Sequence, residues 1–483
     1  MQHFLAIDQG TSGTKAVVVD EAGQIASIAE VAVRPQYLTG GGVEQDPEAL
    51  LDSVVGAGRK ALAQAGVPVA AVALANQGET VLAWDRDTGR PLTPAVVWQD
   101  RRAESICTAL TASRTRGAAE FIAQRTGLVL DPYFSAPKMA WIRANMTTAG
   151  VVTTTDTWLI HRLCGAFVTD ASTASRSLLI SLDSVAWDDD LIGLFGLTGE
   201  ALPEIVGCDQ IIGSTDAFGP TIPVAGLIVD QQAALLAESC LAPGDAKCTY
   251  GTGAFLLAQL GDNPARSQSG LTTSVAWRLR DRTSYCVDGQ AYTAASAVRW
   301  AVDLGLIPAA DQVDAVAADS SDGVLCVPAL AGLAAPWWDS AASASFSGMT
   351  LSSGRGHLIR ALLEGIAAQV AALADLVATD LAQPLTRLRV DGGLTQSAVL
   401  MQAQADMARI PVDVYPSLHA TALGAAACAR LALDAALDVT EAVGTWTPDR
   451  TYEPTWSADR AEQFMAQWMR AAQSVLAHKE STT

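Results

Sequence analysis

The chain has 483 residues, half of them apolar and 17% charged, a composition that suits two large folded domains and argues against intrinsic disorder. Its 51 acidic and 31 basic residues leave a net charge of −20, so we expect neither nucleic acid nor a membrane surface as a partner. The N-terminus lacks a signal-peptide pattern and the eight cysteines form no CxxC pair, which predicts a cytoplasmic protein with reduced thiols. Only the polar tail, His478–Thr483, is predicted to be loose.

The first half of the chain is predicted to alternate strands, turns and helices. In chain order, the predicted elements are strands at Phe4–Ile7, Ala16–Asp20 and Ile25–Ala29, a helix from Pro47 to about Ala65, a strand at Val69–Ala75, and a hairpin with strands at Val81–Asp85 and Pro94–Trp98. The helix start is marked by Asp46 and Pro47, which are favoured at the cap and at the first helical position.

The second half repeats the opening pattern of the first. Its predicted elements are strands at Lys247–Thr249 and Ala254–Ala258 around a glycine turn, a long helix at Gly356–Leu376, and a strand at Leu388–Val390. Two halves that both begin with strand, glycine turn and strand indicate a structural duplication. Since Pro243-Gly244-Asp245 interrupts an apolar helix, we predict two α/β domains, residues 1–240 and 241–483. Both are expected to have mixed sheets flanked by helices, with a ligand cleft between them.

One polar segment stands between the first two predicted strands, Asp8-Gln9-Gly10-Thr11-Ser12-Gly13-Thr14-Lys15. Its glycines let the backbone approach an anion, its hydroxyl and amide groups are donors, and Lys15 can neutralise phosphate charge. Asp8 ends a strand, where its carboxylate suits a hydrated Mg²⁺ ion. The segment is not a Walker A loop, because that spacing is absent and a strand follows instead of a helix. By itself it also fits an ordinary polar hairpin.

Three further segments combine glycine or acidic residues with a strand end. Gly251-Thr252-Gly253 is a second turn between strands, and the glycines of Asp391-Gly392-Gly393 allow a flat ring such as adenine to approach the backbone. Asp230, in Val229-Asp230-Gln231-Gln232, follows a buried strand and is placed to take a proton from a substrate hydroxyl. It is also a good helix cap, and each glycine segment taken singly fits an ordinary turn.

With these segments in this order, the sequence resembles the FGGY family of carbohydrate kinases, whose ribonuclease H-like fold is shared with actin and hexokinase. Within the family it is most similar to the glycerol kinases, and the similarity runs from Asp8 to about Leu433. The other matching stretches are Asn76–Thr80, Val97–Arg102, Thr126–Ser135, Tyr250–Gly253, Pro336–Asp339 and Thr421–Ala426. Together and in order, these stretches are far more specific than any one of them alone.

The resemblance implies an enzyme that uses ATP and Mg²⁺ to phosphorylate a small polyol or sugar by in-line transfer. Asp230 matches the general base of the family and Asp8 the acidic residue near magnesium. The residues that match the ATP-binding turns are Thr11, Ser12, Lys15, Gly251, Thr252, Gly392 and Gly393. The residues that match the polyol pocket are Glu79, Trp98, Tyr133, Asp230, Gln231 and Phe255. A homo-oligomer, either dimer or tetramer, is left open.

The chain departs from the glycerol kinase pattern at three places. Gly78 stands where an Arg is usual, which removes a fork of donors and predicts space for a substrate with one or two more carbons than glycerol. Ala294-Ala295-Ser296 replaces a glycine-containing turn near the nucleotide, where we expect a local adjustment only. Ser345-Phe346-Ser347-Gly348 lacks a basic residue that is usual there, so the oligomer contact and allosteric site of the family are not carried over.

Two alternatives differ in the substrate or in the chemistry. A ketose kinase of the xylulose type is left open by Gly78, whereas Asp131-Pro132-Tyr133 favours a polyol kinase. A non-catalytic nucleotide or sugar sensor would not need an acid at position 230 together with both phosphate turns.

Overall fold

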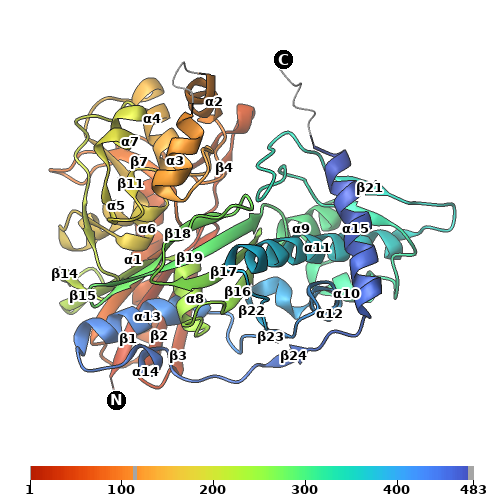
Figure 1. Ribbon diagram of the computed structural model, residues 1–483. Helices are drawn as coiled ribbons and strands as arrows, with labels where there is room; N and C mark the ends of the chain where they lie inside the picture. The colour runs from red at the N-terminus through yellow and green to blue at the C-terminus, as the bar shows by residue number, and fades with distance from the viewer. Residues whose placement is uncertain (1, 113–116, 477–483) are drawn as a thin grey trace.

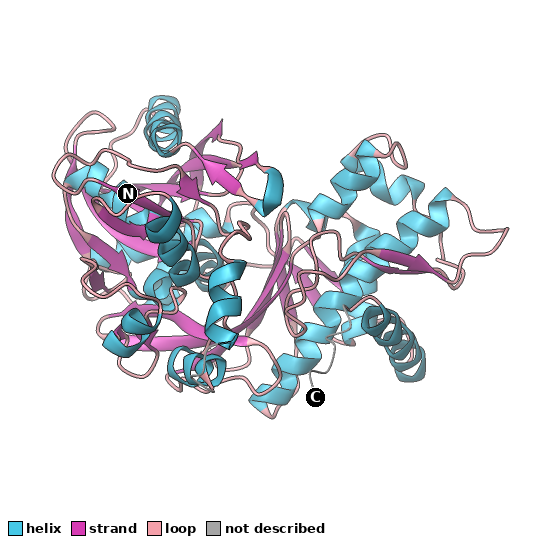
Figure 2. Ribbon diagram, turned by 90° about the horizontal axis from the view of Figure 1, so that it is seen from above, coloured by secondary structure: helices cyan, strands magenta, loops and turns pink. Residues whose placement is uncertain are grey.

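The computed structural model describes residues 2–112 and 117–476. The tail predicted to be loose, 478–483, lies outside the described residues. Two large mixed sheets dominate, one in each half of the chain, and helices cover both (Figure 1). Seen from above, strands flanked by helices occur on both sides of the molecule (Figure 2). The predicted α/β class with two sets of mixed sheets is confirmed.

The first large sheet has six strands. In spatial order they are β14 (Ile211–Thr215), β15 (Ile222–Val229), β6 (Ala71–Asn76), β1 (His3–Gln9), β2 (Gly13–Asp20) and β3 (Ile25–Ala32). β1 pairs antiparallel with β2 and parallel with β6, and β6 is parallel to β15. The carboxyl ends of β1, β6 and β15 therefore meet at one edge of the sheet.

The second large sheet has seven strands. They are, in spatial order, β18 (Thr272–Leu279), β19 (Arg282–Ala291), β17 (Ala254–Gly261), β16 (Ala246–Tyr250), β22 (Leu388–Asp391), β23 (Val412–Val414) and β24 (Arg450–Tyr452). β16 pairs antiparallel with β17 and parallel with β22, which is the arrangement of β1, β2 and β6 over again. This repeat of the core arrangement confirms the predicted duplication.

The remaining sheets of the described residues are smaller. A five-stranded sheet has the order β4 (Gln36–Tyr37), β5 (Val43–Gln45), β8 (Ala95–Val96), β7 (Val81–Trp84) and β9 (Val151–Thr154). The two-stranded sheets pair β10 (Val168–Asp170) with β13 (Glu204–Val206), β11 (Ile180–Ser181) with β12 (Ala186–Trp187), and β20 (Leu325–Val327) with β21 (Ser345–Ser347).

Fifteen α-helices lie within the described residues. Their bounds are α1 Pro47–Ala65, α2 Glu104–Ala112, α3 Ala118–Thr126, α4 Ser135–Asn145, α5 Thr155–Cys164, α6 Ala171–Ser175, α7 Asp189–Leu194, α8 Asp230–Ala237, α9 Ala295–Asp303, α10 Val313–Val316, α11 Arg355–Leu381, α12 Ala398–Ala408, α13 Ala420–Leu433, α14 Val439–Val443 and α15 Ala458–Ser474. The predicted helix at 47–65 is α1, whose N-terminus is capped by Asp46.

Alternation along β1 explains how the first sheet is covered on both faces. Leu5 and Ile7 belong to a buried cluster that includes side chains of α1. Phe4 and Ala6 belong to a second cluster that includes side chains of α8 and α13 together with Leu257 of the second sheet. Because successive side chains of a strand point to opposite faces, one strand serves both cores.

Two helices, α8 and α13, pack against each other where the two large sheets meet (Figure 1). A Cβ at Gly424 of α13 would lie only 1.9 Å from the carbonyl oxygen of Ala233 in α8, so glycine is required at this crossing. α13 comes from the second half of the sequence and packs on the first sheet.

The helix α11 is long and apolar enough to cross a membrane, but 83% of its most apolar window is buried inside the structure. It packs against β17, β19 and β20. Its composition is therefore that of a core helix.

Candidate active site

Asp230 is the first residue of α8, directly after the buried strand β15. Its Oδ1 accepts a hydrogen bond of 2.7 Å from the backbone N–H of Gln231. Burial, together with the neighbouring carboxylates of Asp8 and Glu79, raises the pKa of Asp230 to about 7 against the opposing charge of Lys247. A carboxyl group with a pKa near neutrality suits a general base, since it is both ionised and proton-accepting at the working pH.

The first glycine turn joins β1 to β2, and Asp8 lies opposite Lys15 in this hairpin. The N–H of Gly10 donates to the carbonyl oxygen of Gly13 at 3.0 Å and closes the turn. Burial raises the pKa of Asp8 to about 6, with Lys15 opposing the rise and Asp391 adding to it.

The second glycine turn joins β16 to β17 and receives the start of α9. The N–H of Ala295 donates to the carbonyl oxygen of Gly251 at 3.0 Å, and the N–H of Ala294 donates to that of Thr252 at 2.9 Å. The hydroxyl of Ser296 donates to the same Thr252 oxygen at 2.8 Å. The segment Ala294-Ala295-Ser296 therefore anchors α9 on the turn.

The third glycine turn lies beside the second. β22 runs parallel to β16 with Asp391 opposite Thr249. Gly392 has a φ of +96°, and a Cβ there would lie 2.5 Å from the carbonyl oxygen of Tyr250. Only glycine allows this approach. Gly393 has no atom within 4 Å of its Cβ position, so open space adjoins it.

These pieces of the two halves come together. Asp8 acts electrostatically on both Asp230 and Asp391, and Lys15 also acts on Asp391. The first turn therefore faces the acid at the start of α8 on one side and the third turn on the other. Segments separated by more than 200 residues thus form one charged region between the sheets.

The aromatic residues predicted for a polyol pocket also lie together. The rings of Trp98 and Tyr133 have centroids 5.7 Å apart, and those of Trp98 and Phe255 are 6.0 Å apart, both edge to face. The indole Nε1 of Trp98 donates to the hydroxyl of Thr11 at 2.8 Å. This hydrogen bond joins the aromatic pocket to the first glycine turn.

A small cavity, called here the inner cavity, has a volume of about 20 Å³. Its lining includes five residues predicted from the sequence, Glu79, Tyr133, Asp230, Gln231 and Phe255. Trp98 lines a larger neighbouring cavity instead, which Tyr133 also borders. The inner cavity has room for about one water molecule, so a substrate can enter only if its walls move apart.

Gly78 has one close neighbour. A Cβ at Gly78 would lie 3.0 Å from Cγ2 of Val229 and would meet no second atom of the described residues within 4 Å. A guanidinium nevertheless reaches the pocket from Arg176, which ends α6 and donates to the carboxylates of Glu79 and Asp288. Space beside Gly78 for a longer substrate stays a prediction, limited on one side by Val229.

Three residues that sequence reasoning missed hold the site in place. Arg176 stacks near the rings of Tyr133 and Phe134 at 5.7 and 5.5 Å. Buried Lys247 donates to the side chains of Gln231 at 2.7 Å and Thr249 at 2.6 Å.

The third missed residue, Lys138, is fully buried, and burial lowers its pKa to about 7. Its Nζ donates to the carbonyl oxygens of Pro132 at 2.9 Å, Phe134 at 2.6 Å, and Tyr133. For all three missed residues, the available signal was a basic residue set among small or apolar neighbours, because a buried cation needs partners.

The site fits a magnesium ion carried with a nucleotide. No group of three His, Cys, Asp or Glu side chains that could hold a metal occurs in residues 2–112 and 117–476. Mg²⁺ does not need such a cage, because it keeps several waters and uses one or two carboxylates together with substrate phosphates. Asp8 is such a carboxylate, and burial raises its pKa to about 6 although the charge of Lys15 opposes the rise.

Comparisons with known proteins agree with this geometry. Residues 3–237 match the N-terminal domain of the FGGY family of carbohydrate kinases, and residues 246–433 match its C-terminal domain. The chain is 41% identical over 494 residues to a glycerol kinase of Aromatoleum aromaticum, covering 98% of both chains. It is 42% identical over 483 residues to that of Gloeobacter violaceus, covering 97% of this chain and 96% of the relative.

Two solved structures of kinases share the fold of this chain. The glycerol kinase of Plasmodium falciparum with ADP superposes with a TM-score of 0.89 at 31% identity over 99% of both chains. A xylulose kinase from Lactobacillus acidophilus shares the fold, with a TM-score of 0.87 at 21% identity over the full length of both chains. With both domain models matched and relatives near 40% identity over its length, the chain belongs to the FGGY family of carbohydrate kinases and is a phosphotransferase that acts on an alcohol.

Proposed function

We propose that the chain transfers the γ-phosphoryl group of ATP to a terminal hydroxyl of glycerol or a slightly longer polyol, as a cytoplasmic enzyme. The observation that carries this proposal is the placement of Asp230. Its carboxyl group borders the inner cavity, has a pKa of about 7, and faces Asp8 of the first glycine turn. The glycerol kinases among its relatives support the choice of acceptor.

Asp230 would act as the general base in this reaction. The substrate hydroxyl would lie in the inner cavity between Asp230, Glu79 and Gln231, and would lose its proton to Asp230 as its oxygen attacks the γ-phosphorus. The Lys247 ammonium holds the Gln231 side chain in place through its 2.7 Å hydrogen bond. Glu79 is held by Arg176 and would accept a second hydroxyl of the polyol.

The nucleotide would lie across the three glycine turns. Thr11, Ser12 and Lys15 of the first turn and Gly251 and Thr252 of the second would bind the phosphates, through donors directed at an anion. Gly392 and Gly393 of the third would border adenosine, beside the open space at Gly393. A magnesium ion near Asp8 would neutralise charge that develops on the phosphates.

Opening and closing of two domains, 1–240 and 241–483, would admit the substrate. The inner cavity has walls from both, since Glu79 and Asp230 belong to the first and Phe255 and Asp288 to the second. A volume of about 20 Å³ corresponds to the closed state, which keeps water from competing with the hydroxyl. We also propose that the chain assembles as a dimer or tetramer, which analytical sedimentation can test.

The test is ADP release measured with glycerol, erythritol, threitol, xylitol and xylulose, in the wild type and in Asp230→Asn. We expect polyol-dependent ADP release that falls about 100- to 10,000-fold in the variant, since an amide does not accept the proton. A clear preference for xylulose would instead establish a ketose kinase. Thermal stabilisation by ATP without ADP release on any acceptor would establish a sensor.

A further inference from the structure

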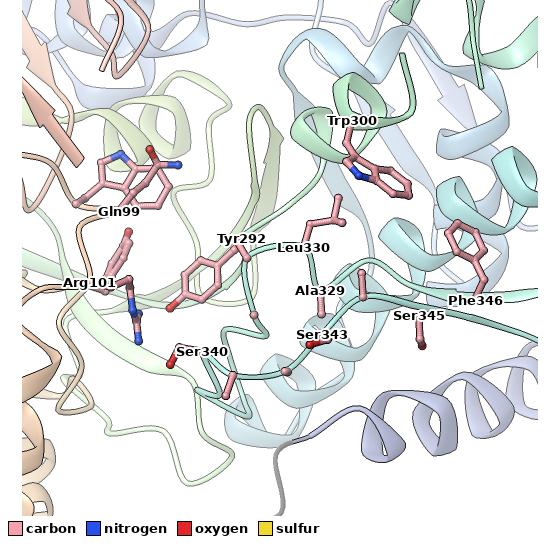
Figure 3. A pocket seen from close by; sticks show the side chains of 17 residues that line it. Gln99, Arg101, Tyr292, Trp300, Ala329, Leu330, Ser340, Ser343, Ser345 and Phe346 are labelled. Atoms are coloured by element: carbon pink, nitrogen blue, oxygen red, sulfur yellow. The ribbon is translucent and has the colours of Figure 1, made fainter. Parts of the chain in front are cut away.

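The largest unassigned feature of the site is a cavity of about 730 Å³ next to the aromatic pocket, called here the outer cavity (Figure 3). Its walls come from both halves of the chain. Gln99 and Arg101 lie on one side, with Tyr292, Trp300, Leu330 and Phe346 on the other. A volume of 300–1,000 Å³ is typical of a site for a ligand several times larger than glycerol.

One polar atom in this cavity lacks a partner. Oε1 of Gln99 is buried and has no hydrogen-bond partner among the described residues, whereas the hydroxyl of Tyr292 pairs with the side chain of Arg101. Figure 3 shows these three side chains around one part of the cavity. Unpaired buried polar atoms are rare in native proteins, so the Gln99 oxygen indicates a ligand that donates a hydrogen bond to it.

The charge of the outer cavity favours a neutral ligand. Arg101 is its only charged lining residue within the described chain, and its Nη1 and Nη2 already bind Asp131 at 3.1 Å and Glu104 at 2.7 Å. The guanidinium charge is thus balanced by two carboxylates. An anionic group would meet a net negative surrounding, whereas a hydroxyl group could donate to the free oxygen of Gln99.

The remaining lining matches a sugar ring. Trp98, Trp300 and Phe346 offer apolar faces, and the small residues of 340–345 include three serine hydroxyls. Broad apolar walls with a few placed polar groups are what an amphipathic ring requires.

Tyr133 borders both cavities, so a substrate that reaches Asp230 at one end can extend past this ring at the other. We propose that the outer cavity is a subsite for a neutral glycosyl group joined to the polyol, so that the preferred substrates are glycosides of glycerol or of similar size. This inference rests on the proposed function.

Phosphoryl transfer to the glycoside forms and breaks the same bonds as transfer to a simple polyol. The free terminal oxygen of the glycerol end forms a bond to the γ-phosphorus and gives its proton to Asp230. The bond from the γ-phosphorus to the bridging oxygen breaks, and ADP leaves with the electron pair. The glycosidic bond is untouched, so the product is a glycosyl-glycerol phosphate.

The test compares kcat/KM for 1-O-glucosylglycerol and for glycerol, measured by ADP release. We expect the wild type to favour the glycoside at least about tenfold, the gain from two or more ordinary hydrogen bonds. Equal or better use of glycerol would overturn the inference and leave the proposed function intact. Absence of ADP release with both compounds would contradict the inference and the proposed function together.

A matched pair of variants locates the effect. Ser345 lines the outer cavity, while Ser347, two residues along β21, is exposed and does not line it. We expect Ser345→Tyr to lower the ratio of the two kcat/KM values at least about tenfold by filling the cavity, and Ser347→Tyr to leave the ratio unchanged. Because the ratio is taken within each variant, a loss of folded protein cancels. An unchanged ratio in Ser345→Tyr would contradict the assignment.

Discussion

The two halves of the molecule begin with the same arrangement and fill it with different chemistry. β1, β2 and β6 pair as β16, β17 and β22 do, with a glycine turn after the first strand of each set. The first set places Asp8 at its strand end and lies beside Asp230. The second places Thr249 at its strand end and presents the turn at Gly251. The duplicated framework therefore exchanges the position of the acid: Asp8 of β1 lies opposite Ala75 of β6, whereas Thr249 of β16 lies opposite Asp391 of β22.

The largest effect on activity is expected for Asp230→Asn, which removes the acid at the start of α8. The expected loss in kcat is about 100- to 10,000-fold, because that is the usual contribution of a general base. Coupled ADP release at pH 8 measures it. A loss smaller than about tenfold would contradict the role of Asp230.

The same variant should gain stability at high pH, which also serves as the folding control. The pKa of Asp230 is raised from 3.8 to about 7, so the folded state binds the proton more tightly, and this contribution is lost as pH rises through 7. Asparagine avoids that loss, which amounts to at most about 4 kcal/mol for three pKa units. Melting temperatures should therefore agree below about pH 4, diverge in favour of the variant between about pH 4 and 7, and keep a constant difference above pH 7. Equal melting temperatures at pH 8 would show that the acid is well solvated.

A second comparison uses one threonine from each glycine turn. Thr11 accepts the hydrogen bond of Trp98, so Thr11→Val leaves a buried N–H unpaired and loosens the polyol pocket as well as the phosphate turn. We expect KM to rise about tenfold for both ATP and the polyol. Thr252→Val should raise KM for ATP alone. Initial-rate kinetics with both substrates varied separate the two outcomes, and identical patterns would contradict the asymmetry.

The pH profile of kcat/KM for the polyol gives a smaller effect. Activity should fall as pH drops below about 7, since Asp230 must be ionised to accept a proton. Removing the charge of Glu79, one of the carboxylates that raise this pKa, should move the acidic limb of the profile to lower pH by up to about one unit. Profiles of wild type and Glu79→Gln, each normalised to its own plateau, measure the shift. Movement toward higher pH would contradict the assignment of this limb to Asp230.

The sequence predicted those parts of the site that have local signals. Strand, glycine turn and strand can be recognised from a few neighbouring residues, and so can Asp230 between a buried strand and a helix. Arg176 and Asp288 could not be paired in this way, because 112 residues separate them and only the packing of the two sheets brings them together. The tight contact between Gly78 and Val229 is equally nonlocal.

The least disruptive change is expected at Glu238, a buried acid between the two halves. Burial raises the pKa of Glu238 well above its ordinary value, and the charge of Asp391 adds to the rise. Two carboxyl groups this close are stable only if one is protonated, so we expect Glu238 to carry the proton and to donate it to Asp391. Glu238→Gln keeps a neutral donor there, so stability and kcat/KM should remain within about twofold of wild type.

Glu238→Ala provides the contrast, because it leaves Asp391 without that donor. A buried group deprived of its partner costs about 1–3 kcal/mol, measured as a shift in the urea midpoint at pH 7. If Gln and Ala are equally damaging at position 238, Glu238 carries a charge that neither replacement supplies. Such a result would contradict the neutral state that we expect for Glu238.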